Sequence, residues 1–304
     1  MTRLWRTALS ILAVVSALGC RRDGPDVSAL LANAHVVARS ARFDAALADT
    51  SSSAANDAPL ARWLLPPFLN EISGLAITAD GRLLAHGDEG GQVSEIDYRS
   101  GILVKYFIVG RESAEVDFEG ITVASDAIYM VVSNGDVYEF REGAHGERVK
   151  YAVHKTGLSE LCEFEGIAYD AQSSSLLLAC KNIRAKELRG SIVIVRWSLE
   201  AGAGGTNGNS RLIVPFTAIA AAIDSKSFTP SDITVDASSG NYLLIAGREK
   251  AFVEVTPLGE VVHAGPIPGD HEQAEGVAIT KDSILIIADE AVTSRGVITL
   301  YRRR

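Results

Sequence analysis

Apolar and polar positions alternate in short runs along this chain, and a similar polar phrase opens such a run five times. The fullest copies read Asp-Phe-Glu-Gly-Ile at residues 117–121, Glu-Phe-Glu-Gly-Ile at 163–167 and Gln-Ala-Glu-Gly-Val at 273–277. Two weaker copies, at 71–75 and 229–233, keep the apolar fifth position and carry Ser in place of the second acid. Each phrase begins an apolar strand pattern that a turn separates from a second one, which indicates repeated antiparallel sheets.

The period of the repeat predicts the architecture. The fourth positions of the five phrases are separated by 46, 46, 66 and 44 residues. A period of about 40 to 50 residues in a strand-rich chain is typical of propeller blades. A Gly-rich loop at 202–209 accounts for much of the longer spacing.

The last repeat predicts how the ring closes. It has room for three strands before the chain ends, whereas residues 60–65 precede the first phrase as a fourth strand precedes each later phrase. We expect this N-terminal segment to fill the vacant outer place, which leaves no raw sheet edge. The sequence therefore predicts an all-β fold, a five-bladed β-propeller over residues 60–304 closed by an N-terminal strand.

The first 19 residues are typical of an export signal, with Arg3 and Arg6 followed by an apolar run over 8–18. That run is shorter than the roughly 20 residues of a membrane span. The next segment, Ala17-Leu18-Gly19-Cys20, resembles the lipobox of bacterial lipoproteins, although Leu18 lies one place late. We predict acylation of Cys20 and a periplasmic, outer-membrane location with membrane contact through the lipid only; plain secretion is the alternative.

Residues 20–59 are rich in Ala, Ser and Asp and show no strand alternation. We predict a flexible tether here, with an Ala-rich helix over 28–47 as the alternative. The propeller then accounts for the remainder as one domain, and we expect a monomer.

The net charge of the chain limits which classes of partner it can bind. The formal net charge is −9 at pH 7, and loss of residues 1–19 with their two Arg would make it −11. Affinity for phosphate backbones depends on clustered Lys and Arg, so nucleic acid is excluded as a partner. Acids gathered at one opening would instead attract cations.

The repeated acids form the candidate site, because the first strand of each blade lines the central channel of a propeller. The phrases then stack their polar positions in two rings near one mouth, and the antiparallel second strands bring further charged residues back to it. The acids expected there are Glu71, Asp117, Glu163, Glu119, Glu165, Glu275 and Asp289. Like charges held close together raise one another's pKa, so these carboxylates need compensation.

Three roles for the acids stay open. They suit Ca²⁺, which takes about six to eight oxygen ligands, and Ca²⁺ is the cofactor we predict. They can instead be structural, accepting backbone hydrogen bonds and pairing with Lys181 and Arg248. The third role is that of a catalytic carboxylate pair.

Taken in order, the five phrases resemble the successive blades of the SdiA-regulated, YjiK-like family of bacterial exported proteins. That resemblance implies a five-bladed propeller related to NHL-repeat proteins, a Ca²⁺ site, protein interaction and no established activity. More distantly the chain is similar to the esterase-like propellers of the phytase group. Ser73 and Ser231 replace the inner acid in two blades, which centres the expected cation site on the other three.

We therefore expect a binding module whose partner, a protein or small ligand, lies at the acidic mouth. The alternative is a Ca²⁺-dependent phosphoesterase or esterase in which Lys181 and Arg248 hold an anionic substrate. Cys162 and Cys180 fall at neighbouring strand ends of the third repeat, so export permits a disulfide, with buried free thiols as the alternative. His271, in the loop before the last phrase, is expected at the mouth as a solvated residue.

Overall fold

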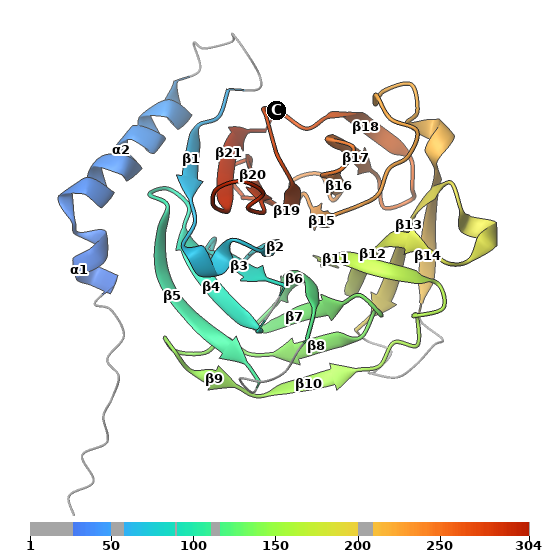
Figure 1. The fold of residues 1–304 in the computed structure, drawn as a ribbon, viewed down its shortest axis with the longest axis horizontal. Helices are drawn as coiled ribbons and strands as arrows, with labels where there is room; N and C mark the ends of the chain where they lie inside the picture. Colours follow the sequence, from blue (N-terminus) through green and yellow to red (C-terminus); the bar gives the residue numbers. More distant parts are fainter. Residues whose placement is uncertain (1–26, 50–57, 89, 111–115, 200–208, 304) are drawn as a thin grey trace, which may run out of the picture.

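A computed structural model describes residues 27–49, 58–88, 90–110, 116–199 and 209–303. Its strands form five sheets arranged as blades around a common axis, with the first strand of each blade innermost (Figure 1). These inner strands, β2, β6, β11, β15 and β19, contact one another in ring order. The predicted five-bladed β-propeller is confirmed.

Each blade is an antiparallel sheet that runs outward from the axis. Blade 1 contains β2 (Ile72–Ile77), β3 (Leu83–Gly87), β4 (Gln92–Asp97) and β5 (Ile102–Val109). Blade 2 contains β6 (Phe118–Ala124), β7 (Ala127–Val132), β8 (Val137–Phe140) and β10 (Tyr151–His154). Blade 3 contains β11 (Cys162–Asp170), β12 (Ser175–Ile183), β13 (Ser191–Ser198) and β14 (Ser210–Pro215). Blade 4 contains β15 (Asp232–Val235), β16 (Tyr242–Ala246), β17 (Ala251–Val255) and β18 (Val261–Pro266).

Blade 5 is built from both ends of the propeller. It contains β19 (Ala274–Ile279), β20 (Ile284–Asp289) and β21 (Val297–Arg302), and its outer strand is β1 (Ala61–Leu64). β1 pairs antiparallel with β21, so the N-terminal segment closes the ring as the sequence predicts. The indole of Trp63 donates a hydrogen bond to the carbonyl of Tyr98 at 2.8 Å, which ties the closing strand to blade 1.

One strand differs from its expected place. The pattern at 148–154 predicts a single outer strand for blade 2, but the structure divides it. β9 (Arg148–Val149) instead pairs in parallel with β5 and extends blade 1. A hydrophobic pattern cannot tell which of two neighbouring sheets a short outer strand joins.

The core consists of apolar clusters between successive blades, since each sheet buries both faces. At the axis the inner strands approach too closely for side chains. A Cβ added to Gly166 would lie 2.8 Å from the Cα of Asp232, and one added to Gly120 would lie 3.0 Å from the backbone nitrogen of Ile167. Glycine in the phrase therefore permits the ring to close around a narrow channel.

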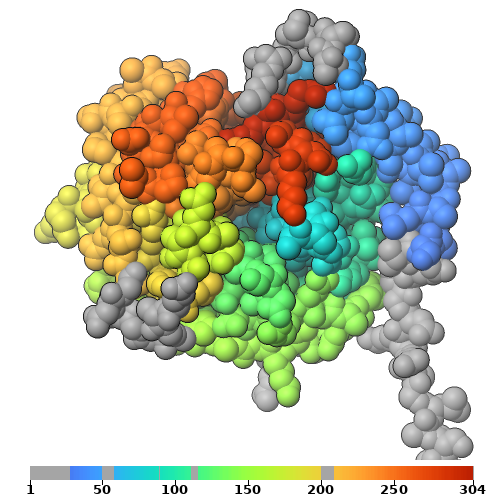
Figure 2. Space-filling model, turned by 180° about the vertical axis from the view of Figure 1, so that it is seen from behind, coloured from blue at the N-terminus to red at the C-terminus, as the bar shows by residue number. Residues whose placement is uncertain are grey.

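The predicted flexible tether differs from the structure over its described part. Short helix α1 (Val27–Leu31) precedes α2 (Ala34–Ala48), which lies against the outside of the ring beside β1 (Figures 1 and 2). Phe43 of α2 is only 2% exposed, within the cluster between blades 5 and 1. The proposed export signal and Cys20 lie outside the described residues. No helix in the described ranges is long and apolar enough to cross a membrane.

Between the strands the described chain also contains three short 3-10 helices. They are η1 (Pro67–Leu69), η2 (Lys186–Leu188) and η4 (Phe216–Ala218). η1 and η4 lie in connections between blades and η2 lies in the loop between β12 and β13, so none interrupts a sheet.

Candidate functional site

A repeated β-bulge presents the inner residue of the phrase to the channel. In blades 1, 2, 3 and 5, the ladder between the first two strands skips the residue just before Gly. The skipped residues are Ser73, Glu119, Glu165 and Glu275. Because bulges re-aim side chains and locally interrupt pairing, the same local irregularity directs these residues to one mouth.

Blade 3 has a second bulge, opposite the first. Its ladder pairs Phe164 with Cys180 and Glu163 with Asn182, so Lys181 is skipped on β12. The ammonium of Lys181 forms a short ion pair with Glu165, the residue skipped on β11. The two irregularities therefore bring one cation and one anion together at the channel.

The three inner acids converge on this lysine. Glu119, Glu165 and Glu275 all interact electrostatically with Lys181, and Glu119 shares a hydrogen bond with Glu165. Glu165 is buried, at 6% exposure, and Lys181 is partly buried. The predicted convergence of the three acids is thus present, and the compensating charge is a side chain of blade 3.

Protonation follows from burial and mutual repulsion. Burial, followed by the charges of Glu165 and Asp117, raises the pKa of Glu119 far above its ordinary value. Burial, followed by the charge of Glu165, raises the pKa of Glu275 to about 7. Burial opposes the ammonium of Lys181, but its hydrogen bond to Glu165 and the charges of Glu165, Glu119 and Glu275 together outweigh this and raise the pKa of Lys181. At neutral pH Lys181 is therefore paired with Glu165. Glu119 keeps its proton and donates a hydrogen bond to Glu165.

The outer acids do not join the cluster equally. Glu163 is held by Arg184 at 2.8 Å and by the amide of Asn182 at 2.6 Å, and these hydrogen bonds, that of Asn182 foremost, lower its pKa. Glu71 and Asp117 are exposed at the rim, where Asp117 acts on the cluster through its charge. The outer ring therefore supplies negative potential at the mouth, and Glu163 has a structural partner.

The sequence predicted Asp289 at the mouth, but in the structure its side chain is buried against His271. Its carboxylate lies 2.7 Å from Nδ1 of His271, whose Nε2 lies 2.9 Å from the hydroxyl of Tyr301. All three side chains are buried, so His271 is not the solvated mouth residue that its loop position suggested. The next residue, Glu290, faces the channel instead, and burial followed by the charge of Asp88 raises its pKa. The end of the second strand was expected to bring both residues to the mouth, but successive strand residues point to opposite faces, so only one of the two can face the channel.

Asp232 is a buried carboxyl group that sequence reasoning missed. It occupies the Gly position of the phrase in blade 4, where it is 1% exposed. One oxygen accepts from the backbone N–H of Ile233 and the other from that of Val277 in blade 5, both at 2.8 Å. Burial raises the pKa of Asp232 well above its ordinary value. The break in the Gly column was the available signal for this residue.

A cavity of about 360 Å³ opens beside the acid cluster, between blades 3, 4 and 5. Glu165 and Glu275 line one part of it together with Lys181, and Arg248 lines another. Arg248 is exposed and has no hydrogen bond or ion pair with any of the described residues. The predicted pairing of Arg248 with a phrase acid is therefore absent from the described part of the site.

The donor groups at the mouth fit Ca²⁺ only in part. Carboxylate oxygens are the ligands that Ca²⁺ prefers, but the ammonium of Lys181 already lies among them. Within the described residues, no group of three or more His, Cys, Asp or Glu side chains is arranged to hold a metal ion. As they lie, the acids fit an ammonium group, and a metal ion at this place would have to displace Lys181.

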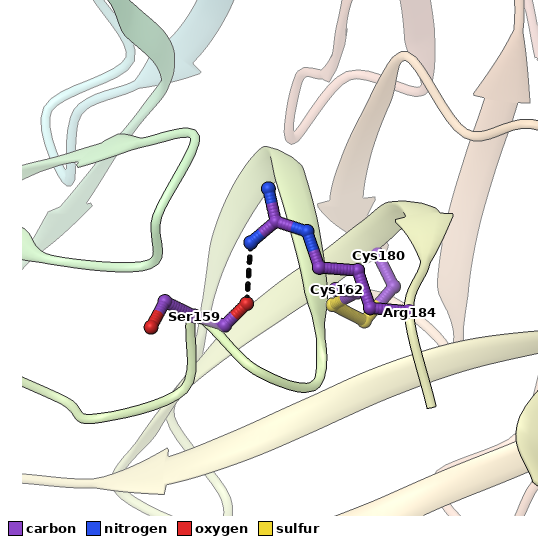
Figure 3. The surroundings of a disulfide bond; sticks show 4 residues. All are labelled: Ser159, Cys162, Cys180 and Arg184. Carbon is purple, nitrogen blue, oxygen red and sulfur yellow. Dashed lines mark hydrogen bonds between the residues drawn. A yellow bond between two sulfur atoms is a disulfide. The ribbon is translucent and has the colours of Figure 1, made fainter. Parts of the chain in front are cut away.

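The disulfide considered from the sequence is present and adjoins the cluster. Cys162 of β11 and Cys180 of β12 are bonded, with their Cα atoms 5.7 Å apart (Figure 3). Beside them, Arg184 donates a hydrogen bond to the backbone carbonyl of Ser159 at 2.5 Å. The crosslink joins the two bulged strands at the residue directly before Lys181, so it helps to fix where the ammonium lies.

Comparisons with known proteins define the fold class. No protein-family model matches the sequence, and no curated protein matches it significantly. Among solved structures, glutaminyl cyclase of Myxococcus xanthus superposes with a TM-score of 0.53 at 11% identity, over 80% of this chain and 94% of that one. A PQQ-bound aldose sugar dehydrogenase from Streptomyces coelicolor gives 0.48 at 12% identity, over 79% and 98%. A gluconolactonase from Xanthomonas campestris gives 0.45 at 15% identity, over 76% and 71%.

At these identities the likeness concerns the fold alone. The chain is a β-propeller protein, and its structural neighbours are propeller proteins that include both enzymes and binding proteins. Membership of the SdiA-regulated family stays a prediction from the phrases. Fold does not choose among functions, so function has to be argued from the mouth.

Proposed function

We propose that this chain is an exported binding propeller whose acidic mouth takes cationic ligands. The observation that carries the proposal is the convergence of Glu119, Glu165 and Glu275 on the single ammonium of Lys181. One buried and two partly buried carboxyl groups are balanced there by one cation, and Asp117 adds further negative charge from the rim. Such a site favours entry of positive charge, because a second cation would replace the protons that now reduce the repulsion.

In this proposal Ca²⁺ competes with the ammonium of Lys181 for the carboxylate oxygens at the mouth. Its preferred oxygen donors are present, but the lysine occupies the centre of the acids. Ca²⁺ affinity should therefore be weak in the natural chain and should increase when the ammonium is removed. The same competition would apply to any small ligand that offers an ammonium group.

Export is supported by the disulfide between Cys162 and Cys180. Disulfides persist in oxidising compartments such as the bacterial periplasm and are rare in the cytosol. Together with the signal-like first 19 residues, this favours an envelope protein, and we propose acylation of Cys20 as its membrane anchor. The ligand or protein partner would then be met outside the cytoplasm.

The first prediction tests cation binding through Lys181→Met. In chelator the variant should melt below wild type, because the acids lose their buried partner. Ca²⁺ at ten times its Kd should raise the variant's Tm by about 3 °C, since such binding stabilises by about 1.4 kcal/mol. Wild type should respond less at the same concentration. Differential scanning fluorimetry in chelator and in graded Ca²⁺ measures both.

Lys150→Met is the matched control, since Lys150 is exposed on blade 2 away from the mouth. It should behave as wild type at every Ca²⁺ concentration. Unchanged melting of Lys181→Met up to millimolar Ca²⁺ would remove Ca²⁺ from the proposal. A response in Lys181→Met that persists in the triple variant with Glu275→Gln and Glu119→Gln would place the cation elsewhere.

A hydrolase is the second candidate, and one observation favours it. Glu119 keeps a proton at neutral pH, as a general acid would, and is hydrogen-bonded to Glu165, which lines the cavity together with Lys181. Assays with simple esters and phosphomonoesters discriminate between the candidates. Turnover that is lost in Glu119→Gln would favour the enzyme, and absence of turnover by the wild type would favour the binding protein.

A further inference from the structure

The cavity beside the acid cluster has charges of both signs on its walls. Its acidic side chains are Glu165, Glu272 and Glu275, and its basic ones are Lys181, Arg248 and Lys250. At about 360 Å³ it lies at the lower end of the range of small-molecule sites, about 300 to 1,000 Å³. A ligand of the size of an amino acid or short peptide fits this volume.

Arg248 is the cation that stays available to a ligand. It is exposed to the cavity and forms no hydrogen bond or ion pair with the described residues. The adjacent Glu249 points to other partners, since its carboxylate accepts hydrogen bonds from Thr229 at 3.0 Å and Ser227 at 2.9 Å. The guanidinium group is therefore positioned to bind an anion, and its planar fork suits a carboxylate.

The turn that carries Arg248 is constrained on both sides. A Cβ at Gly247 would lie 2.3 Å from the carbonyl oxygen of Ala274, so the backbone of blade 4 is pressed against blade 5. Lys250 has φ +49°, in the left-handed region where side chains are unfavourable. The other described non-glycine residues with positive φ are Ser125, Ser174 and Ser283. Of the two cations on this turn, Lys250 forms an ion pair with Asp270 at 3.4 Å, which leaves Arg248 available to a ligand.

The acid side of the cavity offers a complementary acceptor. Glu275 faces the cavity, and the positive charge of Lys181 acts on it from beyond ion-pair distance. Glu165 is already paired with Lys181. A ligand ammonium that approached Glu275 would supply the positive charge that this carboxyl group lacks.

We propose that the ligand of this mouth is a zwitterion, with a carboxylate bound by Arg248 and an ammonium group bound at Glu275. The proposal rests on the proposed function and narrows it, because it assigns a negative as well as a positive group to the ligand. Amino acids and peptides with free termini share this chemistry. They differ in the distance between the two charges.

Isothermal titration of the purified protein with glycylglycine tests the proposal, with glycylglycinamide as the cation-only probe and N-acetylglycylglycine as the anion-only probe. Glycylglycine should bind at least about tenfold more tightly than either, because it forms both charge-assisted contacts. Glycine and triglycine measure which charge separation fits and so distinguish amino acids from peptides.

Two variants assign the ends of the ligand. In Arg248→Gln, glycylglycine should lose its advantage over glycylglycinamide, and in Glu275→Gln it should lose its advantage over N-acetylglycylglycine. Arg211→Gln is the control, since Arg211 is exposed on the outer strand of blade 3 and should leave all affinities unchanged.

The proposal is overturned if glycine, glycylglycine and triglycine all bind no more tightly than their amide and N-acetyl forms, or if Arg248→Gln binds glycylglycine as wild type does. The Ca²⁺ response of Lys181→Met separates this failure from that of the proposed function. If that response is present and the zwitterions do not bind, the mouth takes cations only. If both are absent, the proposed function fails as well.

Discussion

Asp232 stands in blade 4 at the phrase position where the other four blades have Gly, whose lack of a side chain lets neighbouring backbones approach closely. Its side chain occupies the space toward blade 5 and accepts the backbone N–H of Val277. The cost is a buried carboxyl group within electrostatic reach of Glu275 and Glu165. Burial first, and then the charges of Glu275 and Glu165, raise the pKa of Asp232, since nearby carboxyl groups cannot all ionise cheaply. Asp232 and the phrase acids therefore form one connected set of carboxyl groups.

Glu275→Gln should flatten the dependence of stability on pH. The pKa of Glu275 is raised from 4.5 to about 7, so the folded state holds a proton that the unfolded state releases. This favours folding below the unfolded pKa, and the advantage is lost as the pH rises through about 7. Between about pH 5 and pH 8, wild type should lose about 1 to 3 kcal/mol more unfolding free energy than the variant. Urea unfolding at both pH values measures the difference.

Glu260→Gln is the control for this experiment, because Glu260 is an exposed glutamate in blade 4. Its stability should follow that of wild type across the whole range. Parallel curves for wild type and Glu275→Gln would mean that Glu275 does not retain its proton in the folded protein.

At the scale of elements, α2 covers the seam at which the ring closes. Phe43 packs between blades 5 and 1, and its ring meets Tyr98 edge to face with centroids 6.3 Å apart. The guanidinium of Arg302 donates to the carbonyls of Ala46 at 3.1 Å and Leu47 at 2.6 Å, where a helix leaves carbonyl groups unpaired. An isolated helix of this length is marginal in water. These contacts with the last strand therefore account for its formation.

Phe43→Ala should destabilise the protein by about 3 kcal/mol, because it removes a large buried ring from the seam. Val37→Ala on the same helix is the comparison, since Val37 is 51% exposed and such surface changes cost about 0.5 kcal/mol or less. Urea unfolding of both variants supplies the values. Equal stability of the two would show that α2 does not stay docked in solution.

At the scale of the whole molecule, the features that follow from the repeated phrase could be predicted from the sequence, and the docking of α2, which occurs once, could not. The blade count and the closing strand follow from five phrases and one absent strand, which are local patterns. Because Glu119, Glu165 and Glu275 share one position in the phrase, their common direction toward the channel could also be predicted. The docking of α2 depends on contacts between distant segments, which the Ala-rich pattern does not encode.

The errors at the site have one physical origin. A single-residue bulge changes which side of a strand faces the channel, and simple alternation does not anticipate it. The second bulge in blade 3 places Lys181 among the acids, which the sequence offered as the alternative to the metal ion that it predicted. In blade 5 the ladder pairs Ala274 with Asp289, which leaves Glu290 to face the mouth. The residue types and the inward direction of the three phrase acids were therefore predictable, and the directions of residues at the ends of the second strands were not.

Closure by β1 makes the stability of the ring depend on a segment far from the other strands of its blade. Leu60 donates to the carbonyl of Leu300 at 2.7 Å and Leu65 to that of Gly296 at 2.8 Å, so the segment is paired along its length. A chain that begins at residue 58 keeps these bonds. A chain that begins at residue 66 exposes β21 as a raw edge, which invites pairing with another molecule.

The chain that begins at residue 58 should remain monomeric and unfold cooperatively, with lower stability than the full protein because α2 is lost. The chain that begins at residue 66 should associate or fail to unfold cooperatively, since an unpaired edge and an opened ring favour both. Size-exclusion chromatography with light scattering, and urea unfolding followed by circular dichroism, distinguish these outcomes. If the shorter chain is monomeric with the same urea midpoint as the longer one, the ring does not depend on β1, and the acids at its mouth are held in place by the inner strands alone.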